Sequence, residues 1–360
     1  MKYVFMAFCL FGFSFMQADQ SCNNVLRLHE DEIEVIEGLV ERLSKRFNSI
    51  ENEEFADECQ LVAHEIPYRV RKILNDFRNQ RSRVGYLRVE GFLLDNEAIG
   101  PTPAHWDAPW NNSNTLREEV FQCLLSSCAG DIFGWLTQEN GRYLRHVVPI
   151  EKDKNEQLGG SSAVVLVWHV EEAFHPQRAD MMTIMCYRNN EKAGTNLCAV
   201  SNMEIPEQYW QILSEPRFFI HPDKSHLPQN NESQHWQLNN EHFLKIKSFL
   251  EHPEPIAVLQ GKKGDERLVI DEAFMEALPG DLEAKEALDW LYQHMYERRN
   301  LVVMKPGDIL FIDNRLAAHG RTPYVPQYGP HARWLRRVNI TADLTKSYQW
   351  KDKPYGRTIF

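Results

Sequence analysis

The sequence lacks an excess of basic residues, a cysteine metal motif and internal repeats. Its 360 residues include 40 Lys and Arg against 51 Asp and Glu, which gives a formal net charge of −11. Nucleic-acid binding depends on clustered basic side chains that neutralise phosphates, so this composition argues against a nucleic-acid partner. The seven cysteines form no CxxC pair and no spacing typical of a metal site, and we interpret them as scattered reduced thiols.

Long apolar runs are also missing, except near the N-terminus. After Lys2, residues 3–16 form an uncharged apolar stretch that is too short to span a bilayer comfortably. A basic start, an apolar segment and Ala18 are typical of a secretory signal, although Met16 is a poor residue for a cleavage site. A misplaced translation start is the alternative. We therefore treat residues 1–24 as a signal-like or extraneous leader, which leaves export open, whereas the reduced thiols favour a cytoplasmic location.

Hydrophobic periodicity predicts a helical N-terminal part followed by a β-rich remainder. Helices are predicted over residues 31–47, 55–77, 115–127, 241–250 and 281–298, and Pro67 is expected to break or kink the second of them. Residues 101–110 are expected to form a loop. Strands are predicted over residues 86–94, 163–171, 181–187, 218–221, 256–260, 268–271, 301–304, 309–313 and 335–341.

Many short strands, with helices before and among them, predict a mainly β fold with flanking helices. The specific expectation is a double-stranded β-helix, a barrel of the jelly-roll or cupin type, packed on N-terminal and inserted helices. Residues 25–360 would form a single domain with a helix-containing insert at about 203–300. No membrane span is expected in the mature domain.

Two histidines and one glutamate form a candidate metal site. His169 and Glu171 close the apolar run VVLVWHVEE, where a buried carboxylate is costly without a cationic partner. Residues two apart on a strand point to the same face, so both side chains can reach one ion. His319 follows PGDILFIDN, a turn and strand expected to carry it to the barrel rim. Together the three would form a facial triad with open coordination positions, as in non-haem Fe(II) oxygenases.

An HxE pair alone is a weak signal, because 14 histidines and 51 acids produce such pairs by chance. His175 lies next to Pro176 and is expected in a loop. The histidines that compete for the third ligand position are His175, His221, His226 and His331.

An oxygenase of this kind needs 2-oxoglutarate, whose second carboxylate requires a fixed cation. Arginine suits this role because its planar guanidinium binds a carboxylate bidentately. On a strand, Arg333 and Arg337 would share a face from which Arg336 points away. The alternative for this cluster is a solvated basic face. The candidates are Arg321, Arg333, Arg336 and Arg337.

Several separated motifs resemble those of the clavaminate synthase-like oxygenases. They are HVEEAFHPQRAD, FGWLTQENGR, RFFIHPDKSHLP, PGDILFIDNRLAAHGRTPYVPQYG and RWLRRV. Within this family the chain is most similar to enzymes that hydroxylate free L-amino acids, such as asparagine oxygenase and the arginine β-hydroxylases of peptide-antibiotic pathways. The resemblance runs from about Val25 to the C-terminus. It implies an Fe(II)- and 2-oxoglutarate-dependent dioxygenase that hydroxylates a side-chain carbon and releases succinate and CO2.

The resemblance also implies roles for individual residues. His169, Glu171 and His319 would bind iron, and Arg333 and Thr195 would bind 2-oxoglutarate. Arg337 would bind the substrate's α-carboxylate, and Gln138 and Glu171 would bind its α-amino group. Asp223, Ser225 and Asp271 would form an acidic pocket for the substrate's side chain. Such a pocket favours arginine or lysine, followed by asparagine or another polar amino acid. The family's second acid, two residues after Asp271, is replaced by Ala273.

Because Glu171 fills the carboxylate position, hydroxylation is expected rather than halogenation. Two alternatives remain open at this stage: the same chemistry on a peptide or other small metabolite, and a non-catalytic cupin-like barrel that only binds metal. Arg333 favours the enzyme, because a mere metal binder has no use for a carboxylate clamp.

Overall fold

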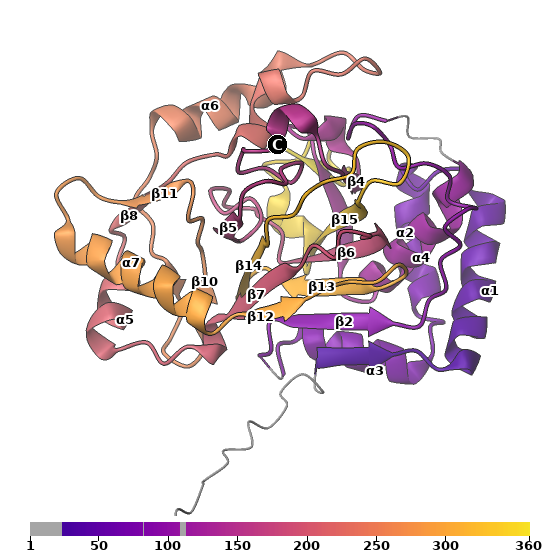
Figure 1. Ribbon diagram of the computed structural model, residues 1–360, viewed down its shortest axis with the longest axis horizontal. Coiled ribbons are helices and arrows are strands. Elements are labelled where there is room, and N and C mark those ends of the chain that lie inside the picture. The colour runs from indigo at the N-terminus through magenta and orange to yellow at the C-terminus, as the bar shows by residue number, and fades with distance from the viewer. Residues whose placement is uncertain (1–23, 82, 109–112) are drawn as a thin grey trace, which may run out of the picture.

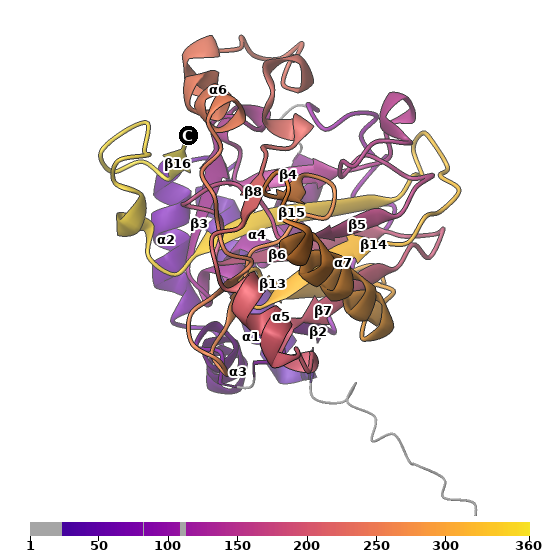
Figure 2. The ribbon, with the colours of Figure 1, turned by 90° about the vertical axis from the view of Figure 1, so that its left-hand side faces the viewer.

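The computed structural model describes residues 24–81, 83–108 and 113–360. The predicted leader therefore lies outside the described residues, apart from Asn24. None of the helices within these ranges combines the length and the apolar character that crossing a bilayer requires. Figures 1 and 2 show helices α1 to α4 on one side of a β-sheet core and helices α5 to α7 on the other.

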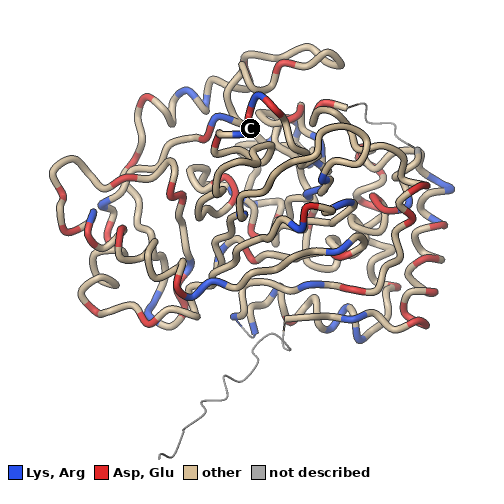
Figure 3. Tube along the Cα trace, in the orientation of Figure 1, with Lys and Arg blue, Asp and Glu red and all other residues tan. Residues whose placement is uncertain are grey.

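The N-terminal helices cover one face of the core. They are α1 (Glu30–Arg46), α2 (Glu53–Ala63), α3 (Tyr68–Arg78) and α4 (Leu116–Ser127). In α1 the apolar residues at helical spacing are buried, and Figure 3 shows acidic positions along this helix on the side of the molecule away from the insert. Pro67 immediately precedes α3 and separates it from α2, so the predicted break is confirmed.

Two sheets form the core. The larger has the order β1-β2-β13-β6-β15-β3-β16, with β4 also pairing β15, and the smaller has the order β12-β7-β14-β5. The bounds in the larger sheet are β1 Val25–Arg27, β2 Tyr86–Glu90, β3 Asp131–Trp135, β4 Leu144–Val147, β6 Met181–Arg188, β13 Ile309–Asp313, β15 Trp334–Thr341 and β16 Thr358–Ile359. Those in the smaller sheet are β5 Leu166–His169, β7 Thr195–Ala199, β12 Asn300–Val302 and β14 Ala317–Arg321.

Alternation along the strands assigns side chains to layers. On β6, Met182 and Ile184 pack with Leu197 of β7 and Ala317 of β14 in an apolar cluster between the two sheets. Met181, on the opposite face of β6, joins the cluster formed with the N-terminal helices. Because successive side chains of a strand point to opposite faces, β6 contributes side chains to both apolar clusters.

The segment between β7 and β12 packs on the outer face of the smaller sheet. Its elements are α5 Glu207–Leu213, β8 Phe218–Ile220, α6 Leu244–Glu251, β9 Leu259–Gln260, β10 Arg267–Leu268, β11 Met275–Ala277 and α7 Leu282–Glu297. Its apolar cluster includes Leu288 and Leu291 of α7, which join Trp168 of β5 and Ala318 of β14. The insert therefore covers the side of the smaller sheet that faces away from the larger one.

The prediction of a sheet core with flanking helices is confirmed, although strands β3, β4, β7 and β14 were not predicted, and two further differences bear on the site. No strand ladder among the described residues joins the two sheets into a closed barrel. The predicted strand 163–171 is shorter than expected, because β5 ends at His169 and Glu171 lies in the following turn. The ladder partner of β5 decides where it ends, and a hydrophobic run does not reveal that partner.

Candidate active site

Pairing of β5 with β14 brings the two histidines together. His169 is the last residue of β5 and lies directly opposite His319 in the antiparallel register. Their ring centroids are 4.2 Å apart. Gly320 permits this close approach, since a Cβ there would lie 2.5 Å from the carbonyl oxygen of Leu166.

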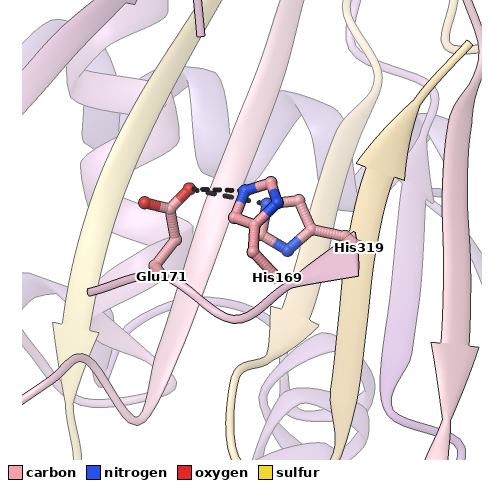
Figure 4. Close-up of side chains that lie close together, drawn as sticks. All are labelled: His169, Glu171 and His319. Atoms are coloured by element: carbon pink, nitrogen blue, oxygen red, sulfur yellow. Dashed lines mark ion pairs between the residues drawn. The ribbon is translucent and has the colours of Figure 1, made fainter. Parts of the chain in front are cut away.

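Asn314 fixes Glu171 beyond the end of β5. The backbone N–H of Glu171 donates to Asn314 Oδ1 at 2.7 Å, and Asn314 Nδ2 donates to the Glu171 carbonyl oxygen at 3.0 Å. The side chain then reaches the histidines, with Oε1 at 3.7 Å from His169 Nε2 and 3.4 Å from His319 Nε2 (Figure 4). Glu171 thus joins the histidines from a turn, although both members of the HxE pair were expected on one strand.

The three side chains fit a metal ion. Their ligand atoms all lie within 4.8 Å of one another. His169 Nδ1 lies 2.9 Å from the carbonyl oxygen of Val167, a contact in which Nδ1–H donates and leaves the Nε2 lone pair for a metal. Two imidazole nitrogens and one carboxylate oxygen are the donor set of a non-haem iron site.

The charges around this cluster are strongly coupled. Burial works against the charged form of Glu171, but Arg337 and the two imidazoles hold the pKa of Glu171 well below its usual range. Burial, together with the charge of His169, lowers the pKa of His319 to about 4. Glu171 overcomes the effect of burial on His169 and raises the pKa of His169 to about 9. Metal binding requires neutral imidazoles, so a metal ion held by this cluster would have to displace the proton of His169.

The competing histidines lie elsewhere. His175 follows the turn after β5, in a loop as predicted, and stacks edge-on against Trp135. His226 is buried with its Nδ1 at 2.8 Å from Thr137 Oγ1. His221 lies near Glu276, and His331 is exposed. Within the described part of the chain, the grouping that can hold a metal is His169, Glu171 and His319.

A cavity of about 190 Å³ lies over this cluster. It is lined by every residue assigned a site role from the sequence: Gln138, His169, Glu171, Thr195, Asp223, Ser225, Asp271, His319, Arg333 and Arg337. These residues come from four strands and from loops, and they lie between positions 138 and 337 of the chain. The fold therefore brings the predicted site residues to one place.

Arg333 precedes β15, and Arg336 and Arg337 lie on opposite faces of this strand. Arg333 and Arg337 line the cavity, while Arg336 points to the other side and pairs with Glu119 at 2.8 Å. Arg333 is 3% exposed and Arg336 is 6% exposed, so the alternative of a solvated basic face is wrong. Arg321 donates to the backbone carbonyl groups of Ser161 and Val164. The Nε atoms of Arg333, Arg336 and Arg337 are all buried without a partner, but Arg336 and Arg337 form ion pairs, whereas Arg333 has none within the described residues.

Residues expected at the substrate's head group already contact one another. Arg337 Nη1 pairs with Glu171 Oε2, and Arg337 Nη2 lies 3.4 Å from Glu172 Oε1. Gln138 Nε2 donates to Ser225 Oγ.

Asp223 and Asp271 have local roles as well as a place in the cavity wall. Asp223 Oδ1 accepts from the backbone N–H of Ser225 at 2.6 Å, and Asp271 Oδ1 accepts from those of Ala273 and Phe274 at 3.0 and 3.2 Å. Burial raises the pKa of Asp223, and it raises the pKa of Asp271 to about 7. Within the described ranges, neither carboxylate has a lysine or arginine ion-pair partner.

Four residues near the site were not predicted from the sequence. Glu172 follows Glu171 in HVEE, and Asn314 ends the motif ILFIDN, so both stood next to motifs that the sequence analysis used. Glu139 likewise follows Gln138 in FGWLTQENGR, whereas Arg145 had no comparable signal, because strand pairing brings it to the site. The four residues are Glu139, Arg145, Glu172 and Asn314.

The fold and the site define a class of protein. A His–Glu–His cluster between two facing sheets, with an arginine along the cavity, is the arrangement of a non-haem iron oxygenase that uses 2-oxoglutarate. The sequence profile of the taurine catabolism dioxygenase TauD, TfdA family matches residues 129–339. The chain belongs to this family and is a 2-oxoglutarate-dependent dioxygenase with iron as its metal.

Known proteins cover almost the whole chain. Enduracididine beta-hydroxylase from Streptomyces hygroscopicus is 36% identical over 93% of this chain and 99% of its own length. L-ornithine/L-arginine 3-hydroxylase from Catenulispora acidiphila is 35% identical over 88% and 94%, respectively. The crystal structure of the non-heme iron oxygenase OrfP in complex with Fe, succinate and (3S)-hydroxy-L-Arg has a TM-score of 0.87 and 30% identity, and covers 93% of this chain and 99% of that one.

The resemblance to clavaminate synthase-like oxygenases is thereby confirmed. The alternative of a barrel that binds metal without catalysis finds no support, because the named relatives are hydroxylases.

Proposed function

We propose that this dioxygenase hydroxylates a side-chain carbon of a free L-amino acid with a basic side chain, with arginine or lysine preferred over asparagine. The observation that carries the proposal is the pair Asp223 and Asp271, which line the cavity of the His–Glu–His cluster without a lysine or arginine partner in the described chain. A buried carboxylate without a counter-charge is costly, and a substrate guanidinium or ammonium group supplies that charge. The names of the relatives, which act on enduracididine, ornithine and arginine, support the same substrate class.

His169, Glu171 and His319 would hold Fe(II). Once bound, iron and 2-oxoglutarate would activate dioxygen, which is the oxidant: one oxygen atom would go to the substrate carbon as hydroxyl and the other to succinate, with CO2 released from 2-oxoglutarate. Arg333 would bind the far carboxylate of 2-oxoglutarate; this role is supported by its buried guanidinium, which has no ion-pair partner among the described residues, unlike those of Arg336 and Arg337. Thr195, on strand β7 of the smaller sheet, also lines the cavity and would donate its hydroxyl to the same carboxylate.

Arg337 would bind the substrate's α-carboxylate, and Gln138 and Glu171 would contact its α-amino group. The ion pair between Arg337 and Glu171 supports this assignment. A zwitterionic head group brings one charge for each partner, so it can enter between them without leaving either charge unpaired. A peptide bond at either end would remove one of these charges, which favours a free amino acid.

Asp223, Ser225 and Asp271 would receive the basic side chain. Ala273 also lines the cavity, so the second acid of the family is absent where it would face the substrate. The neighbouring Glu272 does not replace it, because its Oε2 accepts from the Tyr296 hydroxyl at 2.9 Å. The side-chain pocket therefore has one acidic residue fewer than the family's arginine enzymes, so we propose lysine as a substrate on equal terms with arginine.

Hydroxylation is the expected outcome because Glu171 supplies the carboxylate ligand, and halogenation would need that position free for halide. Chlorination of substrate by the purified enzyme in the presence of chloride would contradict this assignment.

We also propose that the two facing sheets are the halves of a double-stranded β-helix of the jelly-roll type, and that residues 25–360 act as one domain. A cytoplasmic location is supported by the free state of the described cysteines, Cys59, Cys123, Cys128, Cys186 and Cys198. Expression with and without residues 1–24, followed by cell fractionation, tests the location; secretion of the longer chain would contradict it.

The proposal is tested by measuring succinate formation from 2-oxoglutarate with Fe(II) and air across a panel of free L-amino acids. Strong stimulation by arginine or lysine supports the iron site, the basic pocket and the free amino-acid substrate together. Slow turnover without stimulation by any panel member would refute the free amino acid and favour a peptidic or tethered substrate. Absence of turnover from metal-loaded protein would refute the function as a whole.

A further inference from the structure

Two arginines face each other across the wall of the cavity. In the antiparallel pairing of β4 with β15, Arg145 lies directly opposite Arg337, and both side chains line the cavity. They are 13% and 11% exposed, so solvent screens their repulsion poorly. Such a pair persists only where nearby acids neutralise it.

Two glutamates supply this neutralisation. Glu172 Oε1 lies between the arginines, 3.4 Å from Arg337 Nη2 and 3.8 Å from Arg145 Nη1. Glu139 Oε1 accepts from Arg145 Nε at 3.1 Å. The backbone of Glu172 has φ of +47°, a left-handed conformation that is costly for a residue other than glycine. The surrounding contacts therefore hold a strained residue immediately after Glu171.

Arg145 fixes the orientation of the Gln138 side chain. Its Nη1 donates to Gln138 Oε1, while Gln138 Nε2 donates to Ser225 Oγ. An amide carbonyl oxygen accepts two hydrogen bonds, so Oε1 retains one acceptor position after Arg145 has bound it. A flipped amide would set its NH2 group against the guanidinium and lose that contact, whereas the Ser225 hydroxyl can pair with either end of the amide, so Arg145 decides the orientation.

We propose that Arg145 is a positioning residue for recognition of the substrate's α-ammonium group. It holds Gln138 with Oε1 as an acceptor for the ammonium, and Glu139 and Glu172 hold Arg145 in place against the charge of Arg337. This inference rests on the proposed function, in which Gln138 contacts the α-amino group. Its consequence is selectivity: an amino acid binds better than the same molecule without the amino group, because only the ammonium uses the fixed acceptor.

The test compares wild type with Arg145→Lys, which keeps the positive charge but cannot donate to Gln138 and Glu139 with a planar fork. The probes are L-arginine, its desamino analogue 5-guanidinopentanoate, and agmatine, which lacks the α-carboxylate. Binding to the iron- and 2-oxoglutarate-loaded enzyme without dioxygen is measured by calorimetry, and succinate formation gives KM and kcat. We expect the preference for L-arginine over 5-guanidinopentanoate to fall about tenfold or more. The preference over agmatine, kcat and the KM for 2-oxoglutarate should stay within about twofold.

Arg336→Lys is the matched control, because Arg336 lies on the same strand as Arg337 but forms its buried ion pair with Glu119 on the face away from the cavity. It should leave both preferences unchanged. Should Arg145→Lys fail to fold, Glu139→Gln weakens the hold on Arg145 Nε and should lower the same preference by a smaller factor.

An unchanged preference over 5-guanidinopentanoate in a folded Arg145→Lys variant would overturn the inference. So would an equal loss of affinity for all three probes, which indicates general disorder of the cavity. Wild-type enzyme that binds none of the free amino acids would instead overturn the proposed function, so the two failures are distinguishable.

Discussion

Replacing Asp271 with asparagine separates the charge of this side chain from its role in the local turn. Oδ1 of Asp271 accepts hydrogen bonds from the backbone N–H groups of Ala273 and Phe274. An asparagine Oδ1 can accept both, so Asp271→Asn should preserve the turn and remove only the negative charge. A hydrogen bond to a charged group contributes about 1.5–3 kcal/mol. At 25 °C this corresponds to a loss of about 10- to 150-fold in kcat/KM for L-arginine.

The assay is succinate formation with L-arginine and with L-citrulline, in which a neutral urea replaces the guanidinium. Asp271→Asn should lower turnover of L-arginine while leaving that of L-citrulline within about threefold, because a neutral side chain makes little use of the charge. Burial raises the pKa of Asp271 to about 7, with His169 opposing and Asp223 adding to this rise. Below that pKa the acid is neutral, so the wild-type preference for L-arginine should weaken between pH 8 and pH 6. The variant should show no such dependence.

An equal loss for the two substrates would refute the reasoning, because it would mean that Asp271 acts through the shape of the turn and not through its charge. Unchanged turnover of L-arginine would refute it as well. A urea denaturation curve of the variant separates these results from simple destabilisation.

Three further predictions follow from the buried charges. Arg333→Met should raise the KM for 2-oxoglutarate about tenfold or more and change the KM for the amino acid little, since a bidentate charged contact is lost; equal effects on both would contradict the clamp. Ala273→Asp should increase the preference for L-arginine over L-citrulline about tenfold by adding a second acid to the cavity wall, and an unchanged ratio in the succinate assay would place this position away from the substrate side chain. Burial raises the pKa of Glu51 from 4.5 to about 7 in the folded chain, so the folded state holds its proton longer than the unfolded state. Stability from this group is therefore present below pH 4.5 and is lost as the pH rises through 7, and Glu51→Gln should flatten the pH dependence of urea unfolding over that range; parallel profiles for the two proteins would contradict this.

Features with a local periodic signal could be predicted from the sequence. The apolar spacing of α1, the break at Pro67 and the opposite faces of Arg336 and Arg337 all depend on residues within a few positions of one another. The HxE pair and His319 were identified for a related reason, because each stands beside an apolar run. Their residue types pointed to metal chemistry before any geometry was available.

Pairing between distant segments decided where several strands lie and how the site residues meet. Strands β7 and β14 are buried on both faces, so they show no alternation that would reveal them in the sequence. The pairing of β5 with β14 stops at His169, so β5 ends there. Glu171 therefore lies in the following turn, where Asn314 holds its backbone. The pairing of β4 with β15 sets Arg145 against Arg337. The sequence alone identified the candidate metal ligands and most of the candidate binding residues. Only the tertiary structure decided how they meet, because register joins segments far apart in the chain and leaves no local trace in it.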